Sequence, residues 1–112
     1  MQRYCLALDL INDPALIKAY EEYHVQIWPE IKKSILDYDV LDMEIYRIQN
    51  RLFMIMETTD DFSFDKKAAA DAANHKVQEW EALMWTYQQS LPGAAKGEKW
   101  VLMNKIFDLK NQ

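Results

Sequence analysis

A tyrosine and a histidine four residues apart, Tyr20 and His24, are the side chains of this sequence best suited to acid–base chemistry. If they belong to a helix, they share one face and the phenol lies beside the imidazole. Imidazole titrates near neutral pH, so the pair suits proton transfer on a small polar ligand. The alternative interpretation is structural: the end of an amphipathic helix, whose histidine bonds a backbone carbonyl.

Other catalytic and metal-binding motifs are missing from the sequence. It contains no glycine-rich phosphate loop, no Gly-x-Ser-x-Gly and no His-Glu-x-x-His. The two histidines are far apart and make a poor zinc set without cysteine, and we expect His75 to be solvated. We therefore expect neither a metal nor a cofactor.

The composition predicts one ordered domain spanning residues 1–112, since half of the residues are hydrophobic and only two glycines and three prolines occur. A formal net charge of −5 without any basic run disfavours nucleic acid as a partner. No signal peptide opens the chain and no apolar segment is long enough for a bilayer, so we expect a cytoplasmic protein without a membrane partner. Cys5, the only cysteine, excludes an internal disulfide, and its apolar surroundings predict a buried, inert thiol.

The first elements are predicted from an apolar run and a pair of capping residues. Residues 2–10 are apolar with polar ends, which indicates a strand. Asp13 is a good N-cap and Pro14 fits the first helical position, so a helix is expected from there to about His24. The helix would carry Tyr20 and His24 on one face.

A proline interrupts this helical region, because Pro29 cannot lie deep inside a helix. We expect a break near residues 25–28 and a second helix from Pro29 to about Asp37. Residues 39–48 alternate in polarity and residues 52–58 are almost wholly apolar, which predicts a hairpin. The alternation places Val40, Asp42, Glu44, Tyr46 and Ile48 on one face of the first hairpin strand and Leu41, Met43, Ile45 and Arg47 on the other.

The second half of the sequence predicts another broken helical region and a last strand. A short helical piece is expected through residues 68–73, a kink near Asn74, and a helix from about Lys76 to Ser90. Residues 100–109 read as the last strand. The expected apolar stripe of the longer helix consists of Val77, Trp80, Met84 and Tyr87.

The resulting order, β-α-β-β-α-β, is the ferredoxin-like α+β plan, a four-stranded antiparallel sheet with its helices on one face. The other face would be apolar and uncovered, which is unusual for a monomer. We therefore expect a symmetric homodimer in which two sheets face each other.

A single histidine among tyrosines and tryptophans, without a metal motif, suits a carbohydrate site, since aromatic rings stack on the apolar faces of sugars. The stretch Tyr20-x-x-x-His24-x-x-Ile27-Trp28-Pro29-Glu30 resembles the signature of the L-rhamnose mutarotase family. The resemblance continues through Ile45-Tyr46, residues 52–57 and Gln78-Glu79-Trp80, and it covers nearly the whole chain.

The resemblance implies a dimeric ferredoxin-like α+β barrel that interconverts the α and β anomers of a 6-deoxy-L-hexose, L-rhamnose or L-fucose, without a cofactor. It also implies that His24 is the proton donor, that Tyr20 and Tyr46 orient sugar hydroxyls, and that Trp80 stacks on the ring. Glu81 is a candidate second acid–base group. The substrate contacts expected on this basis are Tyr20, Trp28, Met43, Tyr46, Trp80 and Glu81.

Two departures from the family pattern leave the identity of the sugar substrate undecided. Met43 stands where a rhamnose-type site has a tyrosine, and Glu81 stands where that site has a second tryptophan. The two exchanges favour L-fucose, whereas the family as a whole favours L-rhamnose. Two functions of other classes also remain: a small dimeric ferredoxin-like oxygenase, and a sugar-binding module without catalysis.

Overall fold

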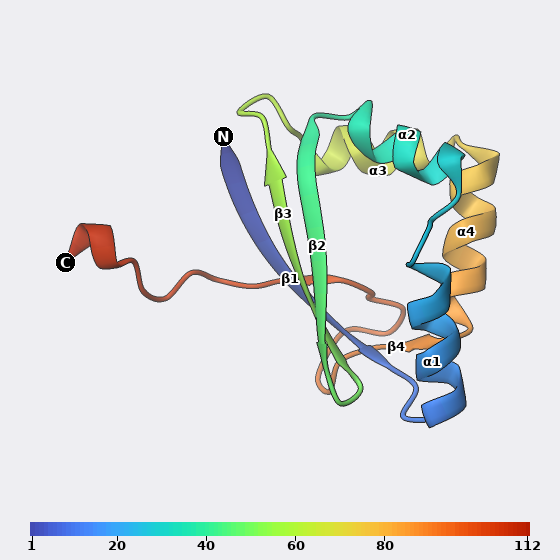
Figure 1. Cartoon of the computed structure of the whole chain (residues 1–112). Coiled ribbons are helices and arrows are strands. Elements are labelled where there is room, and N and C mark those ends of the chain that lie inside the picture. The colour runs from blue at the N-terminus through green and yellow to red at the C-terminus, as the bar shows by residue number, and fades with distance from the viewer.

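The computed structural model describes all 112 residues and places four helices on one side of an antiparallel sheet (Figure 1). This is the predicted ferredoxin-like α+β order, with both helical regions divided in two. None of the helices combines the length and apolar character needed to cross a membrane. In chain order the elements are β1 (Gln2–Leu10), α1 (Pro14–Tyr23), α2 (Pro29–Leu36), β2 (Val40–Ile48), β3 (Arg51–Thr58), α3 (Phe64–Ala72), α4 (His75–Trp85), β4 (Gln88–Gln89), β5 (Val101–Leu102) and the 3₁₀ turn η1 (Leu109–Asn111).

The two capping signals around the first helical region are confirmed. The carboxylate of Asp13 accepts the backbone N–H groups of Ala15 and Leu16, and Pro14 opens α1. The helix ends at Tyr23 and α2 begins at Pro29, which leaves the expected break between them. The break turns the chain, so that α2 runs from beside α4 toward the start of β2 (Figure 1).

The strand order is β2-β3-β1-β4, with β5 also paired to β1. β3 pairs with β1 along its whole length, from Thr58 opposite Gln2 to Arg51 opposite Asp9. The short strands β4 and β5 both pair with β1, β4 at its C-terminal end and β5 near its middle. The fourth strand position of the predicted sheet is therefore shared by two short segments.

The strand predicted over residues 100–109 is wrong in its extent, because only Val101–Leu102 pairs with β1. After Met103 donates its N–H to the Cys5 carbonyl, the chain leaves the sheet and projects away from the body (Figure 1). We call residues 103–112 the arm. The apolar pattern that predicted a strand is present, but nothing in the chain covers it: Ile106 is 95% exposed.

The helix predicted to reach Ser90 ends earlier, at Trp85. Thr86 caps it and donates its hydroxyl to the Leu83 carbonyl, and Gln88 then pairs with β1. Pairing with the sheet overrides the helical pattern here, so Tyr87 follows the helix instead of lying on its stripe. α3 also begins four residues before the predicted helical piece, because the Ser63 hydroxyl caps it by accepting the N–H of Lys66.

The predicted faces of the first hairpin strand need one correction. The register shifts between Val40 and Asp42, which marks a β-bulge. The extra residue turns Val40 to the helix-covered face, where it is 2% exposed and packs with the core near Met43 and Ile45. Sequence alternation alone had placed Val40 with Asp42.

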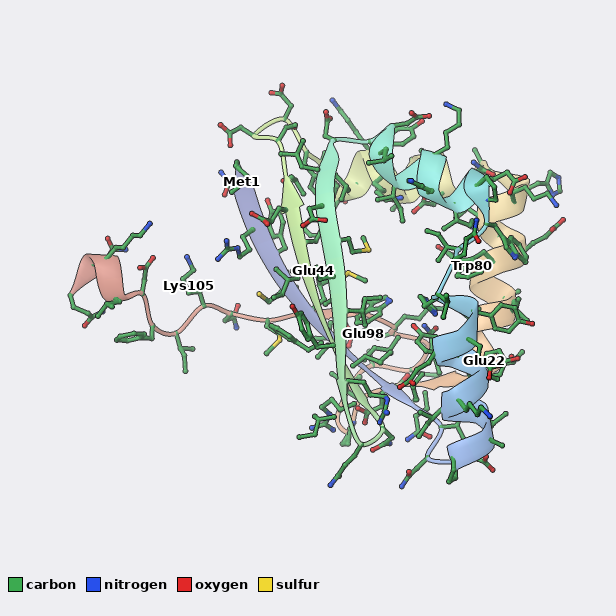
Figure 2. All side chains as sticks on the ribbon, viewed as in Figure 1. Met1, Glu22, Glu44, Trp80, Glu98 and Lys105 are labelled. Carbon is green, nitrogen blue, oxygen red and sulfur yellow. The ribbon has the colours of Figure 1, made fainter.

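The core lies between the helices and the sheet. Figure 2 shows Trp80 on the side of α4 that faces the sheet. The opposite sheet face, which we call the open face, has no helix over it (Figure 1). Tyr46 and Ile48 are exposed, and Cys5 is half-buried instead of fully buried, because β1 turns it away from the helices. The buried hydrophobic residues are Leu6, Leu8, Leu10, Tyr20, Ile31, Val40, Leu52, Met54, Met56, Val77, Trp80 and Met84.

Candidate active site

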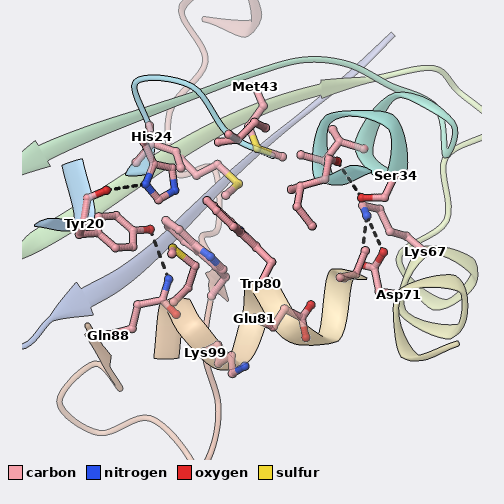
Figure 3. A pocket seen from close by; sticks show the side chains of 18 residues that line it. Tyr20, His24, Ser34, Met43, Lys67, Asp71, Trp80, Glu81, Gln88 and Lys99 are labelled. Atoms are coloured by element: carbon pink, nitrogen blue, oxygen red, sulfur yellow. Dashed lines mark hydrogen bonds and ion pairs between the residues drawn. The ribbon is translucent and has the colours of Figure 1, made fainter. Parts of the chain in front are cut away.

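A cavity of about 250 Å³ opens between the helices and the sheet, and Tyr20 and His24 stand at one end of it (Figure 3). Eleven of its 18 lining residues are hydrophobic. A mostly apolar cavity with a few convergent polar groups is the usual form of a small-molecule site. Tyr20 is one of the eleven, although its phenol adds a polar group, and the other seven lining residues are polar or charged: His24, Ser34, Lys67, Asp71, Glu81, Gln88 and Lys99.

His24 caps the C-terminus of α1, and its ring is oriented by one hydrogen bond. Nδ1 lies 2.7 Å from the carbonyl oxygen of Tyr20. A carbonyl only accepts, so Nδ1 carries the hydrogen and a neutral ring has its free lone pair on Nε2. Burial lowers the pKa of His24, and the bond to the Tyr20 carbonyl partly opposes this effect. Nδ1 therefore has the structural role of bonding a backbone carbonyl. Nε2 has no hydrogen-bond partner in the protein and is available as a base.

The Tyr20 side chain is buried beside this imidazole, with ring centroids 4.3 Å apart. Its hydroxyl accepts a hydrogen bond from Nε2 of Gln88 at 3.3 Å. Burial raises the pKa of Tyr20 to about 12, so the phenol keeps its proton and can donate it in a hydrogen bond to a ligand. Gln88 was not among the predicted site residues, because its position continues a helical pattern, whereas β4 carries its amide into the cavity.

Of the two tryptophans predicted to contact the substrate, Trp80 lies in the cavity wall and Trp28 lies behind it. Trp80 lines the cavity, and its ring lies edge-on to His24 at a centroid distance of 5.6 Å. Trp28 does not line the cavity; it packs against Trp80 at 5.1 Å in a T-shaped arrangement. Tyr23 packs edge-on to Trp80 as well, at 6.2 Å. Trp28 and Tyr23 therefore hold the Trp80 ring in place from outside the cavity.

The remaining predicted contacts divide between the cavity and its edge. Met43 from β2 and Glu81 from α4 line the cavity, and the Glu81 carboxylate accepts a hydrogen bond from Gln78 at 3.4 Å. Tyr46 is 53% exposed and lines a neighbouring depression together with Tyr20 and His24. The structure thus brings Tyr20, His24, Met43, Trp80 and Glu81 together in one cavity, with Tyr46 beside it and Trp28 behind it.

An ion pair that sequence analysis missed closes the other end of the cavity. The ammonium group of Lys67 lies 2.9 and 3.0 Å from the two carboxylate oxygens of Asp71. Both residues come from α3 and are separated by one helical turn. In a sequence, opposite charges at this spacing are typical of a solvated helix face. Only the spatial arrangement reveals that the pair lines the cavity.

The arrangement can bind a small polar molecule and move a proton on it. A neutral imidazole supplies a base, a protonated phenol supplies a donor, and Trp80 supplies an apolar surface. Charged groups at the far end supply further donors and acceptors. A hydroxylated ring with apolar C–H faces fits such a set of groups.

Comparisons with known proteins agree with this chemistry. A family model described as L-rhamnose mutarotase matches residues 3–109. An L-fucose mutarotase from Xanthomonas campestris pv. campestris is 45% identical over 111 residues, which cover 97% of this chain and 89% of that protein. An L-rhamnose mutarotase from Phocaeicola vulgatus is 33% identical over 87 residues, 76% of each chain. The crystal structure of an L-rhamnose mutarotase from Formosa agariphila superimposes with a TM-score of 0.72 over 97% of this chain and 99% of that one; at 23% identity this match shows a shared fold.

Proposed function

The chain belongs to the L-rhamnose mutarotase family, and from this premise we propose that it interconverts the anomers of L-fucose in preference to those of L-rhamnose. It is a sugar mutarotase, an isomerase that acts on carbohydrates. One observation supports L-fucose as the substrate. The L-fucose mutarotase is 45% identical to this chain over nearly its whole length, whereas the L-rhamnose mutarotase is 33% identical over a shorter segment. The comparisons give no support to an oxygenase or to a non-catalytic sugar-binding module.

The proposed mechanism needs one proton to move from the anomeric hydroxyl O1 to the ring oxygen O5. Nε2 of neutral His24 takes the proton from O1, the C1–O5 bond breaks, and a C1=O1 double bond forms. The imidazolium then returns the proton to O5, which gives the open-chain aldehyde. Rotation about C1–C2 and the reverse steps close the ring as the other anomer. General acid–base catalysis of this kind contributes about 10² to 10⁴ in rate.

The other cavity residues would position the sugar for this transfer. Tyr20 keeps its proton and donates a hydrogen bond to a sugar oxygen, and Trp80 stacks on the ring. Glu81 stays a proposed second acid–base group, and Tyr46 a proposed contact at the edge of the site. The apolar walls, Met43 among them, favour the C6 methyl group of a 6-deoxy sugar over a hydroxymethyl group, a preference of roughly 10²-fold at most.

Exchange NMR of the anomeric protons tests this function. The panel is L-fucose, L-rhamnose and D-glucose, each with and without protein. We expect acceleration of exchange for both deoxy sugars, largest for L-fucose and smallest for D-glucose. Faster exchange of L-rhamnose would contradict the substrate, and no acceleration of any sugar would contradict the assigned chemistry.

We also propose a homodimer in which two open faces meet. Exposed apolar side chains on the open face and on the arm support it, since neither has cover within the chain: Ile48 is 73% exposed and Phe107 is 64% exposed. A single copy seldom leaves so much apolar surface in water. A second copy would cover both surfaces in one symmetric assembly. The single domain over residues 1–112 and the cytoplasmic location stay predictions.

A further inference from the structure

We propose that the Lys67–Asp71 ion pair binds the hydroxyl groups on C3 and C4 of the sugar and selects the configuration at C4. This inference rests on the proposed mutarotase function and adds the part of the site that distinguishes one sugar from another. It concerns residues at the end of the cavity away from His24 (Figure 3).

The pair is largely shielded from solvent, although ion pairs at this sequence spacing usually lie on the surface of a helix. The side chains of Lys67 and Asp71 are 16% and 19% exposed, and both line the cavity. Lys33 and Asp37 form an ion pair of the same spacing on α2, with side chains 75% and 50% exposed. The second pair lies on the molecular surface, as helix pairs at this spacing usually do.

Stability of the fold does not explain the sheltered position. Removing two charges from water costs free energy that their mutual attraction only partly returns, so a sheltered ion pair contributes little to stability. α3 contains no fully buried residue, so the pair is not needed to fill a core. A ligand explains it better, because the groups retain bonding capacity: a carboxylate has about four acceptor positions and an ammonium group three donor hydrogens.

The positions of His24 and of the ion pair decide which hydroxyls the pair meets. A sugar whose O1 and O5 lie at Nε2 of His24 presents its opposite edge to the other end of the cavity. In a six-membered ring that edge is C3–C4, because C4 lies across from C1 and C3 lies across from O5. Asp71 can accept from one hydroxyl while Lys67 donates to the oxygen of its neighbour.

The configuration at C4 is one of the two differences between L-fucose and L-rhamnose, the other being at C2. The C4 hydroxyl is axial in L-fucose and equatorial in L-rhamnose. An axial hydroxyl leaves a continuous patch of C–H groups on the opposite ring face, which is the surface that an aromatic ring such as Trp80 stacks against. A ring stacked on Trp80 by that patch directs its axial hydroxyl away from the indole, toward polar groups. We therefore assign a preference for the axial C4 hydroxyl to Lys67 and Asp71.

The test compares two sugars that differ at C4 alone, L-fucose and 6-deoxy-L-glucose. Anomer-exchange NMR gives kcat/KM for each sugar with the wild-type protein and with the double variant Lys67→Met/Asp71→Leu, which leaves no unpaired charge. Sites that hydrogen-bond a substrate hydroxyl discriminate strongly, so we expect the wild type to prefer L-fucose by about 10-fold or more. The double variant should lose this preference to within about twofold, mainly by losing activity on L-fucose.

A matched control is the double variant Lys33→Met/Asp37→Leu, which removes the exposed pair of equal spacing and should keep the wild-type ratio. Asp71→Asn keeps the shape of the side chain and carries the test if the double variant does not fold. An equal loss of activity on both sugars, with an unchanged ratio, would overturn the assignment and leave a structural role. A wild-type protein that accelerates neither sugar would instead contradict the proposed function itself.

Discussion

Nδ1 of His24 lies 2.7 Å from the carbonyl oxygen of Tyr20, one helical turn earlier in α1. The end of the helix provides this acceptor, because the last carbonyls of a helix have no partner within it. The same bond fixes the orientation of the imidazole and the tautomer with a free lone pair on Nε2. The acid–base role of His24 therefore depends on this one backbone contact.

His24→Ala should remove most of the catalysed anomer exchange, a loss of about 10²-fold or more, because the variant lacks the proposed base. The fold should survive, since alanine is tolerated at the end of a helix. Exchange NMR measures the loss and circular dichroism checks the fold. His75→Ala is the matched control, because the other histidine is exposed at the start of α4. Full activity of His24→Ala would remove this residue from the mechanism.

The activity should rise with pH through a pKa below 6.5 and then stay level, because burial lowers the pKa of His24 and the neutral ring is the base. The free energy of unfolding should also increase with pH in this range. The folded state binds fewer protons than the unfolded state in this range, so the contribution of His24 to stability is present above pH 6.5 and is lost as pH falls through the folded pKa.

Two measurements check this pH dependence. NMR titration of the His24 ring gives the folded pKa, and exchange rates between pH 5 and 8 give the pKa of the free enzyme from kcat/KM. The phenol of Tyr20, with a pKa of about 12, should not titrate in that range. A folded pKa of His24 above 6.5 would contradict the buried, neutral base.

Sequence patterns predicted the first half of the fold well, because its signals are local. Asp13, Pro14 and Pro29 act on their own neighbours, and the structure has the helix starts and the break where these residues predict them. The four-residue spacing and the resemblance both selected Tyr20 and His24, and both line the cavity.

The patterns predicted less where contacts between distant parts of the chain determine the structure. The bulge that turns Val40 inward depends on how β2 pairs with β3, and no single residue signals it. Gln88 continues a helical pattern, but pairing with β1 outweighs that preference. The Lys67–Asp71 pair has the spacing of a surface pair, and only the position of α3 over the cavity distinguishes it from Lys33–Asp37. These features could not be read from spacing alone.

Gln88→Ala should weaken both the site and the fold. The buried hydroxyl of Tyr20 would lose its only partner in the protein, which costs roughly 1 to 3 kcal/mol of unfolding free energy. The Tyr20 ring would also lose its fixed position beside His24, so kcat/KM should fall by about 10-fold, equivalent to roughly 1.4 kcal/mol. Urea denaturation and exchange NMR measure the two effects. Gln89→Ala alters the exposed neighbour in β4 and should change neither quantity; equal effects of the two substitutions would show that the hydrogen bond to Tyr20 is unimportant.

Charged residues on the arm should dissociate the proposed dimer. Each chain has a mass of 13.3 kDa, so sedimentation of the wild type should give about twice that value. Ile106→Asp/Phe107→Asp should sediment as a monomer, because the two side chains that it replaces are 95% and 64% exposed in one chain and would be buried only against a second copy. Lys110→Asp reverses a charge on the same arm without replacing an apolar residue, and it should leave the dimer intact. A monomeric wild type at micromolar concentration would contradict the assembly, and a dimer that persists in the double variant would show that the arm is not part of the interface.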